Sequence, residues 1–387
     1  MIVLFGLAIF VSAGLVFLVQ PMTAKLLLPT FGGSPQVWTA ATVFFQAALL
    51  VGYGYAHLSI RALGVRRQPL LHAALLFVPL LVLPIGLRGL ASAGQLPPAI
   101  AVLAILLVSV GAPYVAVSAT SPLLQRWFSA TGHRSAGDPY FLYAAGNVGS
   151  LIGLLGYPLL IEPNLRLADQ ALVWSIGYGA FVALCLGSAL LLSRRGGGAS
   201  GATDAHEDVD AGVSRRARPI DARRRLSWVM RAFIPSSLML GVTTYSSTDI
   251  AAVPLLWASP LSLYLVTFVL AFANRRILPT RAWGLLLPFT TVVVILTIIG
   301  VIALPVWLRL AIHYLGFFVA AMVAHGQLAD DRPTTDHLTQ FYLVLALGGV
   351  LGGAFNALIA PVVFDAVLEY PLVIVAALLL RRGDHTR

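Results

Sequence analysis

The stretch that decides the fold is TTYSSTDIAAVP, residues 243–254, which places Asp249 inside an otherwise hydrophobic run. A carboxylate near the middle of a membrane helix costs on the order of 2.5 to 3.5 kcal/mol, so it normally faces protein, a partner charge or water. The only lysine of the chain, Lys25, stands in the first hydrophobic run. Lys25 precedes Pro29 at nearly the distance at which Asp249 precedes Pro254. This match predicts equivalent positions in two related halves, and an ion pair between them.

The composition is that of an integral membrane protein. Of 387 residues, 59% are hydrophobic and only 10% are charged. The net charge of +10 gives no support to nucleic-acid binding, because the arginines fall between the apolar runs. The first residues, MIVLFGLAIF, contain no basic segment and no small-residue cleavage site, so they predict a retained first span. The single cysteine, Cys185, excludes an internal disulfide and predicts a small core residue.

Apolar runs long enough to cross a bilayer recur along the whole chain. A helical span needs about 20 residues, and twelve runs qualify: 2–28, 37–59, 69–86, 97–122, 139–161, 169–193, 227–245, 249–273, 281–303, 305–325, 338–361 and 367–381. Nearly all loop arginines then fall on one side of the membrane, and only Arg88 and Arg166 stand in loops on the other. This asymmetry predicts that both termini are cytoplasmic. It also predicts a multi-pass protein of a cytoplasmic (inner) membrane.

The division into domains follows from a polar segment in the middle of the chain. Residues 194–226 are rich in Gly, Ala, Asp and Arg and lack aromatic residues. Such a segment cannot bury enough apolar surface to order itself, which predicts a flexible cytosolic linker. The linker would join a six-helix bundle at 1–193 to a second at 227–387. Its acidic cluster, around Asp208, is interpreted as solvated and not as a metal site.

A weak internal repeat supports the two halves. Tyr143, Gly149 and Gly153 of the fifth span recur at a constant spacing as Tyr342, Gly348 and Gly352 of the eleventh. Two six-span repeats in the same direction, joined by a cytosolic linker, resemble the major facilitator superfamily. The expected fold is therefore all-α and major facilitator-like, with about twelve transmembrane helices in two six-helix pseudo-repeats.

Five blocks carry a more specific resemblance. They are QPMTAKLLLPTFGGSPQVW (20–38), SATSPLLQRW (118–127), DPYFLYAAGNVGSLIGLLGYPLLIEP (138–163), PSSLMLGVTTYSSTDIAAVPLLW (235–257) and LEYPL (368–372). Together they resemble the membrane region of bacterial fused proteins that join a major facilitator-like part to a spermidine-synthase-like domain. That soluble domain has no counterpart before Arg387, and no glycine-rich nucleotide loop follows a strand. The sequence therefore predicts no enzyme, no cofactor and no metal.

Polar faces within the spans predict a binding site. Polar residues recur at helical spacing in the second, fourth and fifth spans, where lipid offers no hydrogen bonds. The proposed solute-binding residues are Lys25, Asp249, Gln20, Gln46, Tyr53, Tyr114, Tyr143, Asn147, Thr244 and Tyr245. The alternative is that these polar side chains only tie helices together. The four repeated glycines, Gly149, Gly153, Gly348 and Gly352, are expected to pack helices closely at the seam between the halves.

Two functions from different classes fit these patterns. The first is a secondary carrier for a small solute, with a cationic or polyamine-like compound favoured by the carboxylate of Asp249 and by the resemblance. Protonation of Asp249 would then break and remake its pairing with Lys25. The second is a membrane anchor or regulatory module, without transport, for a cytosolic aminopropyltransferase-like or methyltransferase-like partner. Both functions place the protein in contact with the lipid bilayer.

Overall fold

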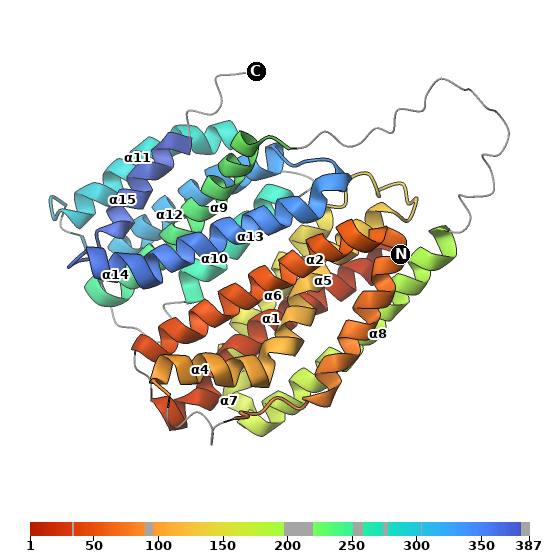
Figure 1. Cartoon of the computed structure of the whole chain (residues 1–387). Helices are drawn as coiled ribbons and strands as arrows, with labels where there is room; N and C mark the ends of the chain where they lie inside the picture. Colours follow the sequence, from red (N-terminus) through yellow and green to blue (C-terminus); the bar gives the residue numbers. More distant parts are fainter. Residues whose placement is uncertain are drawn as a thin grey trace, which may run out of the picture.

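The computed structural model describes residues 1–32, 35–89, 96–196, 220–250, 258–273, 278–302 and 304–380 (Figure 1). For Pro35, Gln36, Trp38, Thr39, Arg195, Gly196, Asp249 and Ile250 it describes the backbone alone. All regular secondary structure in these ranges is helical. The fold is therefore all-α, as the sequence predicts.

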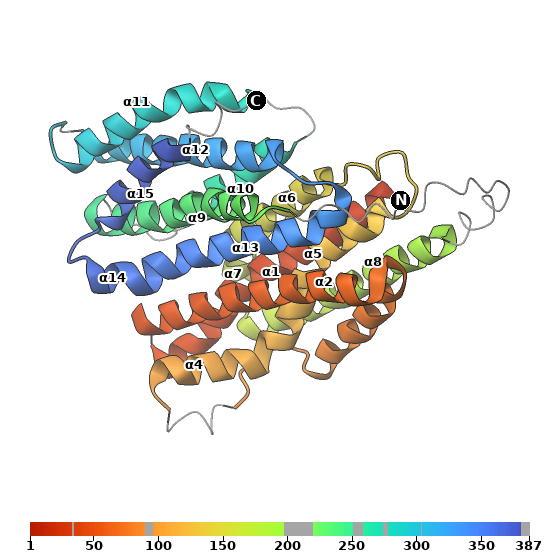
Figure 2. The same ribbon diagram turned by 45° about the horizontal axis from the view of Figure 1, so that its top comes forward.

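The first half of the chain forms one bundle. Its elements are α1 (Ile2–Phe31), α2 (Pro35–Phe77), η1 (Val78–Leu81), α4 (Pro98–Leu106), η2 (Leu107–Gly111), α5 (Ala112–Ser129), α6 (Phe141–Gly156), η3 (Tyr157–Ile161), α7 (Glu162–Asn164) and α8 (Leu167–Gly196). The second half forms another bundle beside it (Figures 1 and 2). It consists of α9 (Ala222–Tyr245), η4 (Ser246–Ile250), α10 (Ala258–Phe272), α11 (Thr280–Ile298), α12 (Val306–Asp330), η5 (Thr335–His337), α13 (Leu338–Ala354), η6 (Phe355–Ile359), α14 (Ala360–Val363) and α15 (Glu369–Ala377).

The predicted number of spans is confirmed by the helices. In the described residues, 9 helical segments are long and apolar enough to cross a membrane, and two shorter apolar helices cover Ala258–Phe272 and Glu369–Leu380. The segment Ala40–Leu81 contains two helices that meet at Gly64, where the backbone is not helical. Each of the twelve predicted runs therefore has its helix. The predicted end of the second run at residue 59 is wrong, because the helix continues to the φ of +69° at Gly64, a conformation that glycine adopts most readily.

Prolines mark the places where long helices change pitch. The π-helical turns η2 and η6 end just before Pro113 and Pro361, and η3 contains Pro158. Proline has no amide hydrogen and its ring crowds the preceding turn, so the regular bonding pattern is interrupted there. The apolar composition on either side keeps each helix running across the bundle.

The predicted linker, 194–226, is too long at both ends. Helix α8 continues to Gly196, and α9 begins at Ala222. Residues 197–219, which include the acidic cluster around Asp208, lie outside the described residues. The structure therefore adds a turn of helix at each end of the expected segment.

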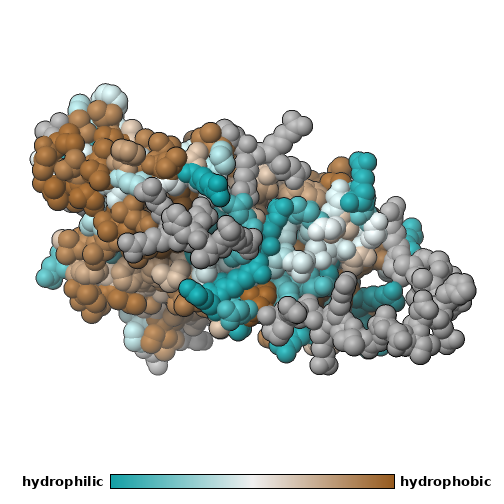
Figure 3. Space-filling view, turned by 90° about the horizontal axis from the view of Figure 1, so that it is seen from above, coloured by the Kyte–Doolittle hydropathy of each residue, from teal (hydrophilic) through white to brown (hydrophobic). Residues whose placement is uncertain are grey.

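Each half has its own apolar core. One core cluster contains residues between Phe5 and Leu192, and a second contains residues between Ile234 and Ala377. A third cluster joins Tyr140 to residues of the second half such as Phe341 and Trp228. The view from above shows apolar residues over the left end of the molecule and hydrophilic residues toward the right (Figure 3). Such an apolar surface suits helices that face lipid.

The repeated glycines pack helices within each half, and the expectation that they lie at the seam is wrong. A Cβ atom on Gly149 would come within 2.3 Å of the Phe10 carbonyl oxygen in α1. In the second half, a Cβ atom on Gly348 would come within 2.5 Å of the Val229 carbonyl oxygen in α9. Gly153 and Gly352 stand equally close to the backbones of Gly14 and Phe233. The first helix of each half therefore packs on its fifth helix through the same contacts.

These contacts also fix how the two halves correspond. The shift in numbering from Phe10 to Val229 is the same as that from Gly14 to Phe233. Applied to Lys25, this shift gives Thr244 and not Asp249. The predicted equivalence of Lys25 and Asp249 is therefore displaced by more than one helical turn.

Candidate solute-binding cavity

A cavity of about 250 Å³ lies between the two halves. Helices α1, α2, α5 and α6 form its wall in the first half, and α9, α10 and α13 form its wall in the second. Its volume is a little below the ~300 to 1,000 Å³ of pockets that hold drug-sized ligands, so it suits a small solute. The polar residues of the lining are Ser12, Gln20, Gln46, Tyr53, Tyr114, Ser118, Ser121, Tyr143, Asn147, Ser150, Ser236, Tyr264 and Tyr342.

The structure brings most of the expected site residues together. The residues of the polar faces that line the cavity are Gln20, Gln46, Tyr53, Tyr114, Tyr143 and Asn147. Helical spacing could find them because each face points inward as one stripe. Ser236 and Tyr264 of the second half were missed, because α9 and α10 present them among apolar residues. The match between Tyr143 and Tyr342 in the repeat was the signal that could have added Tyr342.

Lys25 has a different partner from the expected one. Its ammonium forms an ion pair with the carboxylate of Glu162 in α7, and each side chain is about one-third exposed. The side chain of Asp249 lies outside the described residues, and its backbone belongs to η4. The charge of Lys25 is thus already balanced within the first half. The structure gives no support to the predicted pairing of Lys25 with Asp249.

Two further expected residues point away from the cavity. Thr244 is exposed, and its carbonyl oxygen accepts a hydrogen bond from Thr248. Tyr245 is buried in the core of the second half, where its ring centroid lies 4.6 Å from that of His313 and 5.6 Å from that of Tyr370. Tyr245 is therefore a core residue, not a lining residue.

A cluster of rings closes one end of the cavity. This aromatic seal consists of Tyr140, Tyr143, Phe268, Phe272, Phe341 and Tyr342. The ring centroid of Tyr143 lies 5.3 Å from that of Phe268 and 5.0 Å from that of Tyr342, so the seal joins the two halves. Behind it, the hydroxyl of Tyr342 donates a hydrogen bond of 2.6 Å to Gln125 Oε1. Both of these partners are buried, which makes the contact costly to break.

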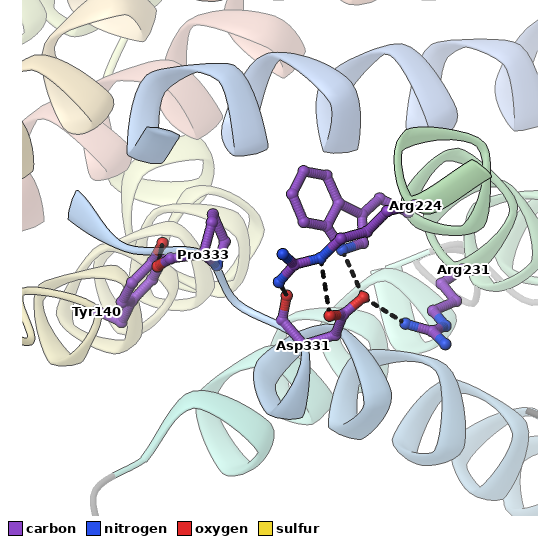
Figure 4. A network of polar contacts seen from close by, with 6 residues as sticks. Tyr140, Arg224, Arg231, Asp331 and Pro333 are labelled. Carbon is purple, nitrogen blue, oxygen red and sulfur yellow. Dashed lines mark hydrogen bonds and ion pairs between the residues drawn. The ribbon is translucent and has the colours of Figure 1, made fainter. Parts of the chain in front are cut away.

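Beyond the seal lies the end of the molecule that carries the loops 130–140 and 331–337, here called the closed face. Asp331 is its central acid (Figure 4). Arg224 and Arg231 of α9 point toward its carboxylate at 3.0 and 3.1 Å, and Trp228 Nε1 donates to it at 2.9 Å. These contacts fix the 331–337 loop to α9 of its own half.

The same loop then contacts the first half. Arg332 pairs with Asp138 at 2.6 Å, and Arg126 pairs with Asp336 at 3.1 Å. The hydroxyl of Tyr140 donates to the carbonyl oxygen of Pro333 at 2.9 Å. Burial raises the pKa of the Tyr140 phenol, which stays a neutral donor.

Five polar contacts between the halves lie at this end. Besides the contacts above, His57 Nδ1 and Thr339 Oγ1 lie 3.1 Å apart. The opposite side of the cavity is here called the far face. The contacts of the closed face tie the two halves together at that end.

Metal binding finds no support in the described part of the chain, which contains no group of three or more His, Cys, Asp or Glu side chains suited to an ion.

Cys185 is buried in α8, as expected for a small core residue.

The arrangement of these helices is that of known carriers. The structure of the proton:xylose symporter XylE of E. coli is similar, with a TM-score of 0.60 and 13% identity over 98% of this chain and 94% of that chain. A bacterial homologue of the iron transporter ferroportin has a TM-score of 0.62 and 14% identity over 98% and 96%. The human organic anion transporter MFSD10 has a TM-score of 0.55 and 16% identity over 98% of both chains.

These likenesses define the class of fold. The chain has the major facilitator fold, with two six-helix pseudo-repeats around a central cavity, as the sequence predicts. No family model matches the chain, and no curated protein matches it. The resemblance to the fused spermidine-synthase-like proteins therefore stays a prediction.

Proposed function

We propose that this protein is a secondary carrier that binds one small polar solute between its halves and moves it across the membrane by rocking them. The observation that carries the proposal is the position of the cavity, whose walls come from both halves and which buried and ion-pair contacts between the halves close at one end. A carrier of this fold exposes a fixed central site alternately to the two sides of the membrane.

The packing of the halves suits such a motion. Close glycine contacts make each half a rigid body, since α1 holds α6 and α9 holds α13 through the backbone. The bonds between the halves are few, and the ion pairs among them are partly exposed. Partly exposed ion pairs contribute roughly 0 to 1 kcal/mol each, so they can break and form again in each cycle.

The direction of opening follows from the arginine asymmetry. The closed face carries the loops that hold most loop arginines, which places it in the cytoplasm under the proposed topology. The structure then represents the outward-facing state of a carrier in the bacterial inner membrane. Both termini lie on the cytoplasmic side in this topology.

The expected cationic or polyamine-like solute has one remaining support, the backbone position of Asp249 in η4, at the end of α9. The anchor alternative, with a cytosolic aminopropyltransferase-like partner, needs no cavity between the halves. We therefore favour the carrier over the anchor. The charge of the solute is inferred from the residues that line the cavity.

The distance between the loops of the closed face tests the proposal without knowledge of the solute. The Cys185→Ser variant gives a background without cysteine, and Gly137→Cys with Thr334→Cys places a spin label on each loop. Both positions are exposed. In liposomes, a carrier shows two populations of distance between the labels, one short and one long.

A label pair within one half serves as the control. Gly137→Cys with Ser193→Cys stays inside the first half and is expected to show a single distance. A single short distance for the first pair, in every solute and at every pH, together with no flux of any solute, would contradict the carrier and leave the anchor.

A further inference from the structure

The described residues that line the cavity are uncharged. In the described part of the chain, no Asp, Glu, Lys, Arg or His lines it. The ion pair of Lys25 with Glu162 is absent from the lining, and Lys25 stands more than a helical turn beyond Gln20, the lining residue nearest to it in α1. A solute in the cavity therefore meets dipoles and ring faces.

This lining would bind a charged solute only weakly. Moving an ion from water into a site without an opposite charge costs several kcal/mol even after relaxation. Tyrosine faces attract a cation, but each contact returns only about 0.5 to 2 kcal/mol. An uncharged solute avoids this cost and loses only the hydrogen bonds that the lining can replace.

Several polar groups of the lining have spare hydrogen-bonding capacity. In the part of the chain that the structure describes, the hydroxyls of Tyr53 and Tyr264 and the amide of Gln46 form no hydrogen bond, while the Tyr143 hydroxyl bonds to the side chain of Asn147. Other lining groups are already engaged: Gln20 Nε2 donates to the Tyr114 hydroxyl at 3.1 Å. The free groups come from α2 and α10, so they belong to both halves.

The phenols of Tyr53, Tyr143 and Tyr264 lie close together. Tyr53 is near enough to Tyr143 and to Tyr264 for their hydroxyls to interact electrostatically, and Tyr143 also interacts with Tyr264. Their rings, with that of Phe268, form an apolar surface beside the hydroxyls. The site thus offers hydrogen bonds on one side of a ligand and flat ring faces on another.

We propose that Tyr53, Tyr143, Tyr264 and Gln46 form the recognition site for an uncharged, polyhydroxylated solute of the size of a monosaccharide or cyclitol. The proposal rests on the carrier function proposed above. Hydroxyl groups of such a solute can each donate and accept, which matches phenols and an amide, while its C–H face packs on the rings.

Gln46 of α2 also contacts the second half directly. Its side chain lies against Gly353 of α13, where a Cβ atom would come within 2.1 Å of Gln46 Nε2. Gly353→Ala therefore pushes the amide away without removing it. Gly284→Ala is the matched control, because a Cβ atom at Gly284 meets nothing within 4 Å and Gly284 lies outside the lining.

The test measures binding to the full-length protein in detergent, by calorimetry and by the shift in unfolding temperature. The uncharged probes are D-glucose, D-xylose and myo-inositol, and the charged probes are choline, spermidine and L-glutamate. At least one uncharged probe is expected to bind, and Tyr53→Phe, Gln46→Leu and Gly353→Ala are each expected to weaken it about tenfold.

Tyr55→Phe controls for the loss of a hydroxyl from α2, since Tyr55 lies outside the lining and its ring stacks on that of His72. It should leave the affinity unchanged. If only a charged probe binds, the inference on the solute is overturned and the carrier function stands. If no uncharged probe binds, the inference is overturned as well, and the label distances decide separately whether the protein is a carrier.

Discussion

The hydroxyl of Tyr342 donates a hydrogen bond to Gln125 Oε1 across the seam between the halves, and both side chains are buried. Tyr342 also contributes its ring to the aromatic seal, against Tyr143 and Tyr140. Tyr342 thus lines the cavity, belongs to the aromatic seal at one end of it and bonds to the opposite half. The state of this contact reports whether the closed face is shut.

Tyr342→Phe is expected to favour opening of the closed face. It leaves Gln125 Oε1 buried without its donor, which costs about 1 to 3 kcal/mol in the closed state and less in a hydrated open state. The population of the long distance between labels at 137 and 334 should rise roughly tenfold, as measured by pulsed electron resonance. In the double variant with Gln125→Leu the shift should be smaller than the sum of the two single shifts. An additive result would show that the two side chains do not interact.

Asp331→Asn is expected to destabilise the protein more than Asp336→Asn does. Asp331 receives bonds from Arg224, Arg231 and Trp228, while Asp336 is exposed and pairs with Arg126. Bonds to a charged group contribute about 1.5 to 3 kcal/mol each, whereas exposed ion pairs contribute about 0 to 1 kcal/mol. Thermal unfolding in detergent should show a drop of several degrees for Asp331→Asn and little change for Asp336→Asn. Equal drops would show that Asp331 is not the main anchor of its loop.

Reversing one charge at the seam should open it, and reversing both should close it again. Asp138→Arg places two arginines together at the closed face, since Arg332 stands 2.6 Å from the present carboxylate. The effect is expected to be modest and to fade at high salt, because both side chains are partly exposed. The label distances measure it, and the swap Asp138→Arg with Arg332→Asp is the control. If the swap opens the seam as far as the single change, pairing is not the cause.

Two neighbouring glycines should respond in opposite ways to alanine. Gly348→Ala places a methyl group 2.5 Å from the Val229 carbonyl oxygen and should destabilise the second half by more than about 1 kcal/mol. Gly349→Ala meets no atom within 4 Å and should stabilise α13 slightly, by up to about 1 kcal/mol. Unfolding temperatures of the two variants decide the matter. Equal effects would show that helix propensity, and not the close contact with α9, governs this position.

Much of the fold could be predicted from the sequence. Hydrophobic runs and loop arginines are local properties, so the spans near α1, α9 and α12 could be placed without coordinates. Polar stripes could be assigned to the interior because lipid cannot satisfy them, which is why Gln46, Tyr53 and Asn147 were found.

The failures concern pairings between distant residues. Lys25 was matched with Asp249 because both precede a proline, yet the ion pair forms with Glu162, the residue that directly follows η3. The spacing of residues along the sequence does not determine which carboxylate lies next to a given amine in the folded protein. Likewise, the glycine pattern predicted close packing of helices. It did not indicate whether Gly149 faces its own half or the other half.

The most direct measurement asks whether the cavity can be reached from both sides of the membrane in turn. Ala13→Cys in the Cys185→Ser background places a thiol on the cavity wall, where it can react with a membrane-impermeant maleimide. In right-side-out vesicles we expect labelling from the far face, and in inverted vesicles we expect labelling to rise when Tyr342→Phe loosens the seal. Labelling from one side alone, in both the parent and the Tyr342→Phe variant, would contradict alternating access.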